Sequence, residues 1–259
     1  MLGMLCNLPN VASAQSPPAE VAKLLAGDGT GQDQFGKAVA FSGDTAIIGA
    51  ARDDDNGIES GSAYVFVNMS GTWTFQQKLT ASDGAQYDFF GESVAVEGDV
   101  ALVGATGVDK ADLDCSGGTC PDVGAAYVFV RSGGVWTEQQ KLLGSNVTCA
   151  SGGIPAGNYP ERMGSSVSLS GATALIGARI GETPLGACPS GSDRTGAAYV
   201  FVESGGVWVE DAKLMASDRS GGDNFGESVS LSGSTALIGA SGNRDFGPVS
   251  GSAYVFVQS

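Results

Sequence analysis

The chain repeats one block of sequence four times. The copies are FGKAVAFSGDTAIIGA from Phe35, FGESVAVEGDVALVGA from Phe90, MGSSVSLSGATALIGA from Met163 and FGESVSLSGSTALIGA from Phe225. In every copy the Gly of the closing Gly-Ala pair follows the Gly of the first pair by 13 residues, and a segment AYVFV comes after it. A repeat of this length indicates one structural unit whose core forms when neighbouring units stack.

Each unit reads as four antiparallel strands. The first two are joined by a two-residue turn such as Gly43-Asp44, and Gly in the first position suits a type II′ hairpin. The third strand, AYVFV, is apolar on both faces, which is typical of a strand between two sheets. The fourth runs from Trp73, Trp136 or Trp208 to a Lys-Leu pair, and its polar middle indicates an outer edge. We expect these tryptophans to pack between units.

Stacked four-stranded units of this kind predict an all-β fold, a β-propeller with four-stranded antiparallel blades. The predicted domain spans residues 21–259, with units at about 25–79, 80–142, 143–214 and 215–259. The last copy has no Trp…Lys-Leu strand, and an unpaired Lys23-Leu24-Leu25 precedes the first. We therefore expect residues 21–26 to pair with 253–257 and close a four-bladed ring within a monomer. The alternative is a fragment or half of a larger propeller.

The paired Phe-Gly and Gly-Ala marks, the AYVF strand and the Trp…Lys-Leu strand resemble the FG-GAP repeat family. The short hairpin between the marks is similar to its bacterial branch and, more distantly, to the repeats of integrin α-chain propellers. The resemblance implies a β-propeller, commonly seven-bladed, in extracellular or cell-surface proteins that bind ligands or adhere. Three features depart from the pattern: Met163 replaces Phe, no proline follows Gly-Ala, and the integrin-type DxDxDG calcium loop is missing.

Composition narrows the partners and the compartment. A net charge of −15 argues against nucleic acid, and no apolar stretch is long enough for membrane insertion. Residues 1–20 read as a signal-peptide remnant and disordered lead-in, with cleavage expected after Ala14 in Ala12-Ser13-Ala14. An ordinary disordered N-terminus is the alternative. The chain is expected to be secreted, periplasmic or on the cell surface.

Catalysis finds little support in the sequence. The chain has no His, which excludes Ser-His-Asp, Cys-His and His-metal sites. Paired carboxylates of a glycan-active enzyme remain a less favoured reading. We expect no enzyme, but a recognition or adhesion module for an extracellular protein or glycan. The alternative is a structural scaffold in a larger surface protein, without a dedicated ligand.

Variable loops indicate where a ligand would bind. The loops between the second and third strands, and those between units, are expected on one face, and the units differ there in length. The candidate ligand-binding residues in these loops are Tyr87, Phe89, Tyr159, Phe246, Asp109, Asp112 and Asp114. Phe89 could instead plug the adjoining core, and the acids could simply be solvated.

Calcium is the one cofactor that the oxygen-rich loops suggest, and none is required. Asp53, Asp55 and Asn56 belong to the densest run of oxygen-bearing side chains and are the candidate ligands. A solvated loop is the alternative. Other acids recur in register before each Phe-Gly pair, which favours a structural role, with the carboxylates accepting hydrogen bonds from loop N–H groups. They are Asp28, Asp33, Asp83, Asp88, Glu161, Asp218 and Asp223.

The expected cleavage leaves an even number of cysteines, which allows them to pair. The chain has five Cys, and removal of residues 1–14 takes Cys6 and leaves four. We predict the pairs Cys115–Cys120 and Cys149–Cys188, which would restrain the longest loops in an oxidising compartment. Four reduced thiols, or a zinc site, are the alternatives.

Overall fold

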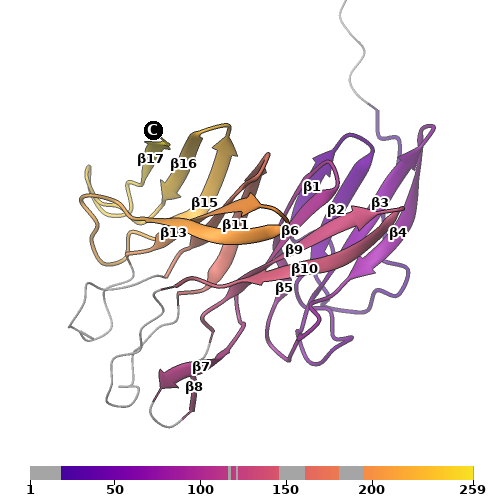
Figure 1. Ribbon diagram of the computed structural model, residues 1–259, viewed down its shortest axis with the longest axis horizontal. Coiled ribbons are helices and arrows are strands. Elements are labelled where there is room, and N and C mark those ends of the chain that lie inside the picture. Colours follow the sequence, from indigo (N-terminus) through magenta and orange to yellow (C-terminus); the bar gives the residue numbers. More distant parts are fainter. Residues whose placement is uncertain (1–18, 116–117, 121, 146–160, 181–194, 259) are drawn as a thin grey trace, which may run out of the picture.

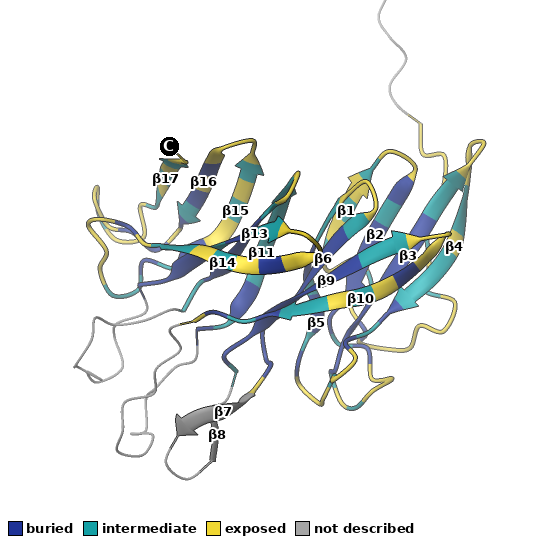
Figure 2. Cartoon of the chain, viewed as in Figure 1, coloured by how far each residue is buried: buried dark blue, intermediate teal, exposed yellow. Residues whose placement is uncertain are grey.

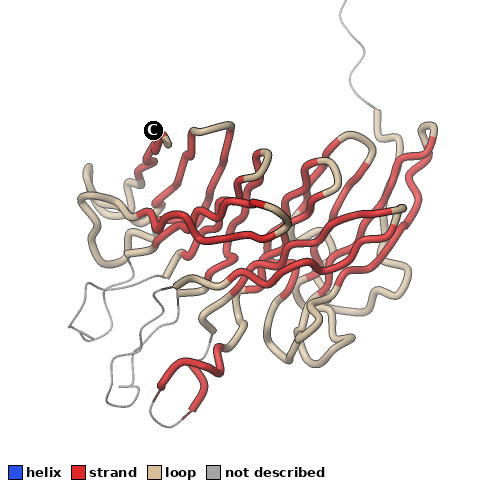
Figure 3. Tube along the Cα trace, viewed as in Figure 1, coloured by secondary structure: helices blue, strands red, loops and turns tan. Residues whose placement is uncertain are grey.

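In the computed structural model, the described residues are 19–115, 118–120, 122–145, 161–180 and 195–258. This part of the chain is all-β, and no helix occurs in it (Figure 3). Four antiparallel sheets stand side by side as an open arc, in the order of the four sequence copies (Figure 1). They are the propeller-like blades that the repeat predicts.

Each sheet follows chain order from its inner to its outer strand. The first sheet contains β1 (Val39–Ser42), β2 (Thr45–Ala50), β3 (Ser62–Met69) and β4 (Thr72–Leu79). The second contains β5 (Phe90–Glu97), β6 (Val100–Ala105), β9 (Ala125–Ser132) and β10 (Val135–Leu142). The third contains β11 (Met163–Ser170), β12 (Thr173–Ala178), β13 (Ala197–Ser204) and β14 (Val207–Leu214). The fourth has three strands, β15 (Phe225–Ser232), β16 (Thr235–Ala240) and β17 (Ser252–Val257).

The predicted glycine turns join the first two strands of every sheet. The turn glycines Gly43, Gly98, Gly171 and Gly233 all have φ between 55° and 58°. Only Gly adopts this left-handed conformation without steric cost, and it lets the chain reverse within two residues. The turn therefore fixes the register of the hairpin, in which Ser42 pairs with Thr45 and Val39 with Ile48.

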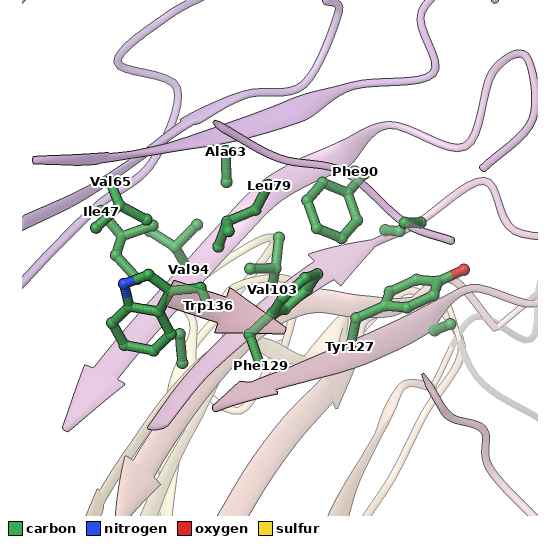
Figure 4. Packing of buried hydrophobic residues seen from close by; sticks show 14 of the residues in the cluster. Ile47, Ala63, Val65, Leu79, Phe90, Val94, Val103, Tyr127, Phe129 and Trp136 are labelled. Atoms are coloured by element: carbon green, nitrogen blue, oxygen red, sulfur yellow. The ribbon is translucent and has the colours of Figure 1, made fainter. Parts of the chain in front are cut away.

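The apolar core lies between neighbouring sheets. Ile47, Ala63 and Val65 of the first sheet face Val94 and Trp136 of the second, and all of them are buried (Figure 4). The next interface buries Trp208 in the same way. The prediction of packing between units is thus confirmed for these two tryptophans. Trp73 is half-buried against the outer face of the first sheet.

Glycines also bring the backbones of neighbouring sheets into direct contact. A Cβ on Gly49 would collide with the carbonyl oxygen of Gly91, and a Cβ on Gly91 would collide with that of Ser62. The same exclusion holds for Gly104 with Gly164 and for Gly177 with Gly226. The Phe-Gly mark of one unit and the Gly-Ala mark of the unit before it are therefore two halves of one junction.

A backbone hydrogen bond completes each junction. The N–H of Phe90 donates to the carbonyl of Ser60 at 2.9 Å. Met163 donates to Val123 at 3.0 Å, and Phe225 donates to Thr195 at 3.0 Å. Since this bond uses main-chain atoms, Met163 replaces Phe in the third unit without loss of the junction.

The predicted ring closure is not found. The first and fourth sheets lie at opposite ends of the arc (Figure 1). Residues 19–26 form no strand, and Leu24 and Ala26 pack against Ile48 and Tyr64 of the first sheet, not beside 253–257. A segment attached to the first sheet cannot also reach the fourth, so it covers the apolar surface nearest to it.

The junction can be tested with two glycines of equal conformation. Gly91 and Gly36 both have φ of 92°, but no atom lies within 4 Å of a Cβ built on Gly36. Gly36→Ala should cost about 1 kcal/mol through backbone strain alone. Gly91→Ala should cost about 2 kcal/mol more, because the added methyl group overpacks the junction. Urea unfolding of dilute protein measures both, and equal losses would contradict this account of the junction.

Candidate recognition face

We define the loop face as the surface made by the loops from second to third strands and from each sheet to the next. These two kinds of loop are hydrogen-bonded to each other. Tyr87 N–H donates to the carbonyl of Ile58 at 2.7 Å, and Phe89 N–H donates to that of Glu59 at 3.1 Å. The hairpin of β7 (Lys110–Cys115) and β8 (Gly118–Cys120) projects on the same side (Figure 1).

The loop face exposes apolar side chains at two places. Tyr87 is 46% exposed and lies beside Ile58, which is 54% exposed. At the fourth sheet Phe246 is 93% exposed, with Val249 at 68% in the same loop. Two of the predicted aromatics are therefore accessible. The sequence analysis did not predict Ile58 and Val249. Each is an apolar residue within a Gly-rich polar loop, and that pattern could have indicated an exposed apolar side chain.

Phe89 is half-buried, and its ring lies against Gly107. Its φ of 55° recurs at the residue before each mark, namely Gln34, Arg162 and Asn224. The conformation of Phe89 is therefore part of the repeat. Its side chain is less available to a ligand than that of Tyr87.

The second unit's long loop contains regular structure that the sequence did not predict. Asp109 is exposed before the hairpin, and its carboxylate accepts a hydrogen bond from Asp122 N–H at 2.9 Å. Asp112 and Asp114 lie on β7, and Cys115 and Cys120 end β7 and β8. The structure describes the backbone of these four residues but not their side chains. Tyr159, Cys149 and Cys188 lie outside the described residues, so both disulfides stay predictions.

A cluster of one tyrosine, one lysine and three carboxylates supports the loop face at the first sheet. The hydroxyl oxygen of Tyr64 lies 2.7 Å from a carboxylate oxygen of Asp53 and 2.9 Å from one of Asp28, and its single proton is donated to one of them at a time. Lys78 Nζ lies 2.9 Å from a carboxylate oxygen of each, and it also pairs with Asp55. These contacts tie the segment before β1, the β2–β3 loop and β4 to one point.

The cluster is electrostatically balanced. Burial alone would raise the pKa of Asp53, but hydrogen bonds from Lys78 and Tyr64 outweigh burial and lower it. The hydrogen bond from Lys78 likewise lowers the pKa of Asp28. Burial favours neutral Lys78, yet its carboxylate partners raise the pKa of the ammonium group overall. At neutral pH the lysine is charged and neutralises acids that would otherwise repel one another.

The arrangement recurs in the next two sheets and is altered in the fourth. In the second, Tyr127 and Lys141 bind Asp83 at 2.9 and 2.7 Å. In the third, Lys213 Nζ lies 2.9 Å from Glu161, which also accepts from Tyr199. In the fourth, Tyr254 donates to Asp218 at 2.9 Å. In the other sheets this lysine lies on the fourth strand, so the three-stranded fourth sheet has no equivalent lysine.

Other buried acids shape the loops themselves. The carboxylates of Asp33, Asp88 and Asp223 accept hydrogen bonds from the backbone N–H three residues earlier, at 2.5, 2.8 and 2.6 Å. The structural role predicted for the recurrent acids is thus confirmed at these positions. Within the described residues, no group of three or more His, Cys, Asp or Glu side chains is arranged to hold a metal ion.

The residues considered for calcium lie around Lys78. Asp53 and Asp55 both pair with its ammonium group, and Asn56 N–H donates to Ser60 Oγ at 3.2 Å. The position that a bound cation would take near these two carboxylates is therefore held by the protein's own cation. Calcium binding by this loop stays a prediction.

A known repeat family matches the segments that carry the repeated junction. The model described as the FG-GAP repeat matches residues 18–66, 73–129 and 208–256. The chain belongs to the FG-GAP repeat family. The matched segments of this FG-GAP chain run from before β1 into β3, from β4 into β9, and from β14 of the third sheet into β17. No curated protein matches it. In its described part, no helix is long and apolar enough to cross a membrane.

Replacing Lys78 should show how much the cluster contributes to the free energy of unfolding. Lys78→Met should lower the free energy of unfolding by about 2 kcal/mol, because buried Asp53 loses its counter-charge while part of the cluster stays open to water. Lys37→Met is the control, since its pair with Glu92 is more exposed, and it should cost about 0.5 kcal/mol. Denaturant unfolding at pH 7 measures both, and equal small losses would contradict the assigned role.

The same variant gives a pH signature. Folded-state pKa values of Asp28 and Asp53 lie below the ordinary 3.8. Their contribution to stability is thus present at neutral pH and lost as the pH falls below about 4. Wild-type protein should lose stability over this range more steeply than Lys78→Met. Melting curves at pH 7, 5 and 3.5 test this, and parallel pH profiles would count against it.

Calcium should matter little to folding. A ligand that binds the folded state raises the melting temperature by mass action, and Lys78 already neutralises the acidic loop of the first sheet. We expect millimolar Ca²⁺ to shift the melting temperature by no more than about 1 °C compared with Mg²⁺. A shift of many degrees that disappears in an Asp53→Asn variant would restore the calcium site.

Proposed function

We propose that this FG-GAP chain is an extracellular or cell-surface recognition module that binds a protein or a glycan through its loop face. FG-GAP repeats are typical of extracellular adhesion and recognition modules. The observation that carries the proposal is the exposure of Tyr87 beside Ile58, and of Phe246 and Val249 in the β16–β17 loop, among the described residues of the loop face.

These side chains have the chemistry of binding anchors. An exposed aromatic ring can stack on the apolar face of a sugar or fill a pocket on a protein. Tyr87 is held in a left-handed conformation, with φ of 67°, by its hydrogen bond to Ile58. The same position has φ of 85° at Gln32 and 90° at Gly222, so this conformation is part of the repeat and fixes the backbone that carries the ring. A ring on such a fixed backbone also loses little entropy on binding.

Binding accounts for the loop face better than catalysis. The acids below the loops have assigned partners: Asp53 and Asp28 pair with Lys78, and Asp83 pairs with Lys141. Carboxylates held as ion-pair partners are poorly placed to exchange protons with a substrate. The absence of His from the sequence points the same way. We therefore infer a non-catalytic module.

The experiment is a screen of the purified chain against glycan and extracellular-protein arrays, followed by titration of each hit. Tyr87→Ser and Phe246→Ser should each weaken binding about tenfold, as expected for loss of an aromatic anchor. Met69→Ser is the matched control, because Met69 is 61% exposed beside the β3–β4 turn, away from the loop face. Ligands that bind all three variants as well as wild type would contradict the loop-face proposal. A screen without hits would favour the scaffold alternative.

A further inference from the structure

The outer face of the fourth sheet presents an apolar surface that is buried at every internal junction. Leu237 occupies the position of Ile47, Leu102 and Leu175 in the repeat. Those three are 0% exposed, whereas Leu237 is 45% exposed. Val255 is 64% exposed, whereas its counterparts Val65 and Val128 are 0% exposed and Val200 is partly buried. The fourth sheet therefore carries one half of a junction, and no described residue of this chain is stacked on it (Figure 2).

The outer face of the first sheet carries the other half. Val39 is 71% exposed, and its counterpart Val94 is 9% exposed inside the first junction. Phe41 is 65% exposed on the same strand. A Cβ on Gly36 would meet no atom within 4 Å, and one on Gly239 would meet only atoms of its own sheet. The two halves that are joined at each internal junction thus stand open at opposite ends of the arc.

The fourth sheet also lacks a positive charge that the other three sheets contain. Asp218 accepts from Tyr254 but has no lysine partner among the described residues. Oδ1 of Asp223, a residue that is 1% exposed, has no hydrogen-bond partner there either. Burial, together with Asp218, Asp245 and Asp223, raises the pKa of Tyr254 to about 12, consistent with a local excess of negative charge. An added ammonium group would complete this cluster.

The segment before the first sheet has the side chains that the fourth sheet lacks. Glu20, Lys23 and Leu24 have the spacing of Glu138, Lys141 and Leu142 at the end of β10. Lys23 is exposed and makes no ion pair within the described part of the chain. It belongs to a segment that already packs on the first sheet through Leu24, much as Leu79 packs in the first junction.

The fourth sheet also lacks a carboxylate at the position that Glu20 would supply. In the second sheet, Glu138 accepts hydrogen bonds from Ser82 N–H and Oγ, both at 2.8 Å. Glu210 in the third sheet binds Ser145 in the same way at 2.7 Å. Ser217 holds the next position in this series, and no carboxylate of the described residues meets it. One short segment therefore carries the missing anion and the missing cation at the required spacing.

We propose that a second copy of this chain docks head to tail on the first. Residues 20–26 of the second copy add a fourth strand to β17, and its first sheet stacks on the exposed face of the fourth sheet. By analogy with the pairs Ala63–Leu79 and Tyr64–Lys78, Ala253 pairs with Leu24 and Tyr254 with Lys23. Strand addition satisfies an open sheet edge through main-chain hydrogen bonds. The two surfaces differ, so the contact forms a two-chain ring if it closes and a linear series if it does not.

The first test measures mass against concentration by light scattering and sedimentation. Wild-type chain should associate, whereas Leu237→Glu and Val39→Glu should each raise the dissociation constant by at least about tenfold. Val207→Glu is the control, since Val207 is 53% exposed on β14 and belongs to neither end face. All three positions are exposed, and melting curves of dilute protein check that each variant folds.

Mixing distinguishes head-to-tail docking from other assemblies. The Val39→Glu chain keeps an intact fourth sheet, and the Leu237→Glu chain keeps an intact first sheet. Each alone should be monomeric, and an equimolar mixture should form a one-to-one dimer through the remaining intact junction. A symmetric pairing of identical faces would leave one variant associated by itself. Closure within one chain would leave all of them monomeric.

The charges give an independent test. Lys23→Glu and Asp218→Lys should each weaken association about tenfold, and a chain carrying both changes should recover most of it. Wild-type protein that stays monomeric at all concentrations overturns the proposal. So does association that survives both end-face variants, or a mixture that stays monomeric.

Discussion

The contact between bare glycine backbones is the constraint on which the rest of the structure depends. At each internal junction a Phe-Gly glycine meets a Gly-Ala glycine so closely that no side chain fits between them. This approach sets how near the inner strands lie, while the outer strands, with larger residues such as Trp136 between them, stand farther apart. Close inner edges and filled outer edges make a wedge, and stacked wedges curve into an arc.

The Tyr, Lys and carboxylate cluster has a second role, because it converts a stack of sheets into a platform for loops. Lys78 joins residues from three separate segments at the point where the loops leave the first sheet. The loops can therefore vary in length, as at the β7–β8 hairpin, without disturbing the strands beneath them. Exposed Tyr87 and Phe246 stand on this platform. In the same clusters the carboxylates are neutralised by lysine, so a loop rich in carboxylates need not form a metal site.

Much of the fold could be predicted because its rules are local. The glycine turns and the strand order depend on a few residues within one repeat, and all four copies share them. The tryptophan recurs in three copies and is buried between sheets at Trp136 and Trp208. The candidate site was harder to predict. Tyr87 and Phe246 are exposed as expected, but Ile58 and Val249 were missed, since nothing in a loop sequence states which side chains face water. Lys78 was read as the end of an edge strand, and its partners Asp28 and Asp53 are 50 and 25 residues away.

The sequence by itself determined the unit: a sheet of antiparallel strands present in four copies, its turns, its inner and outer strands and the glycine marks that join the copies. These depend on backbone conformation and on which residues alternate along a strand, which short-range sequence records. Only the tertiary structure decided where residues 21–26 lie, what neutralises Asp53 and whether the ends meet. Those outcomes depend on the angle between successive sheets and on charges far apart in the chain. The small rotations at the successive junctions add up to the angle between the first and fourth sheets, and the sequence of a single repeat does not determine this total.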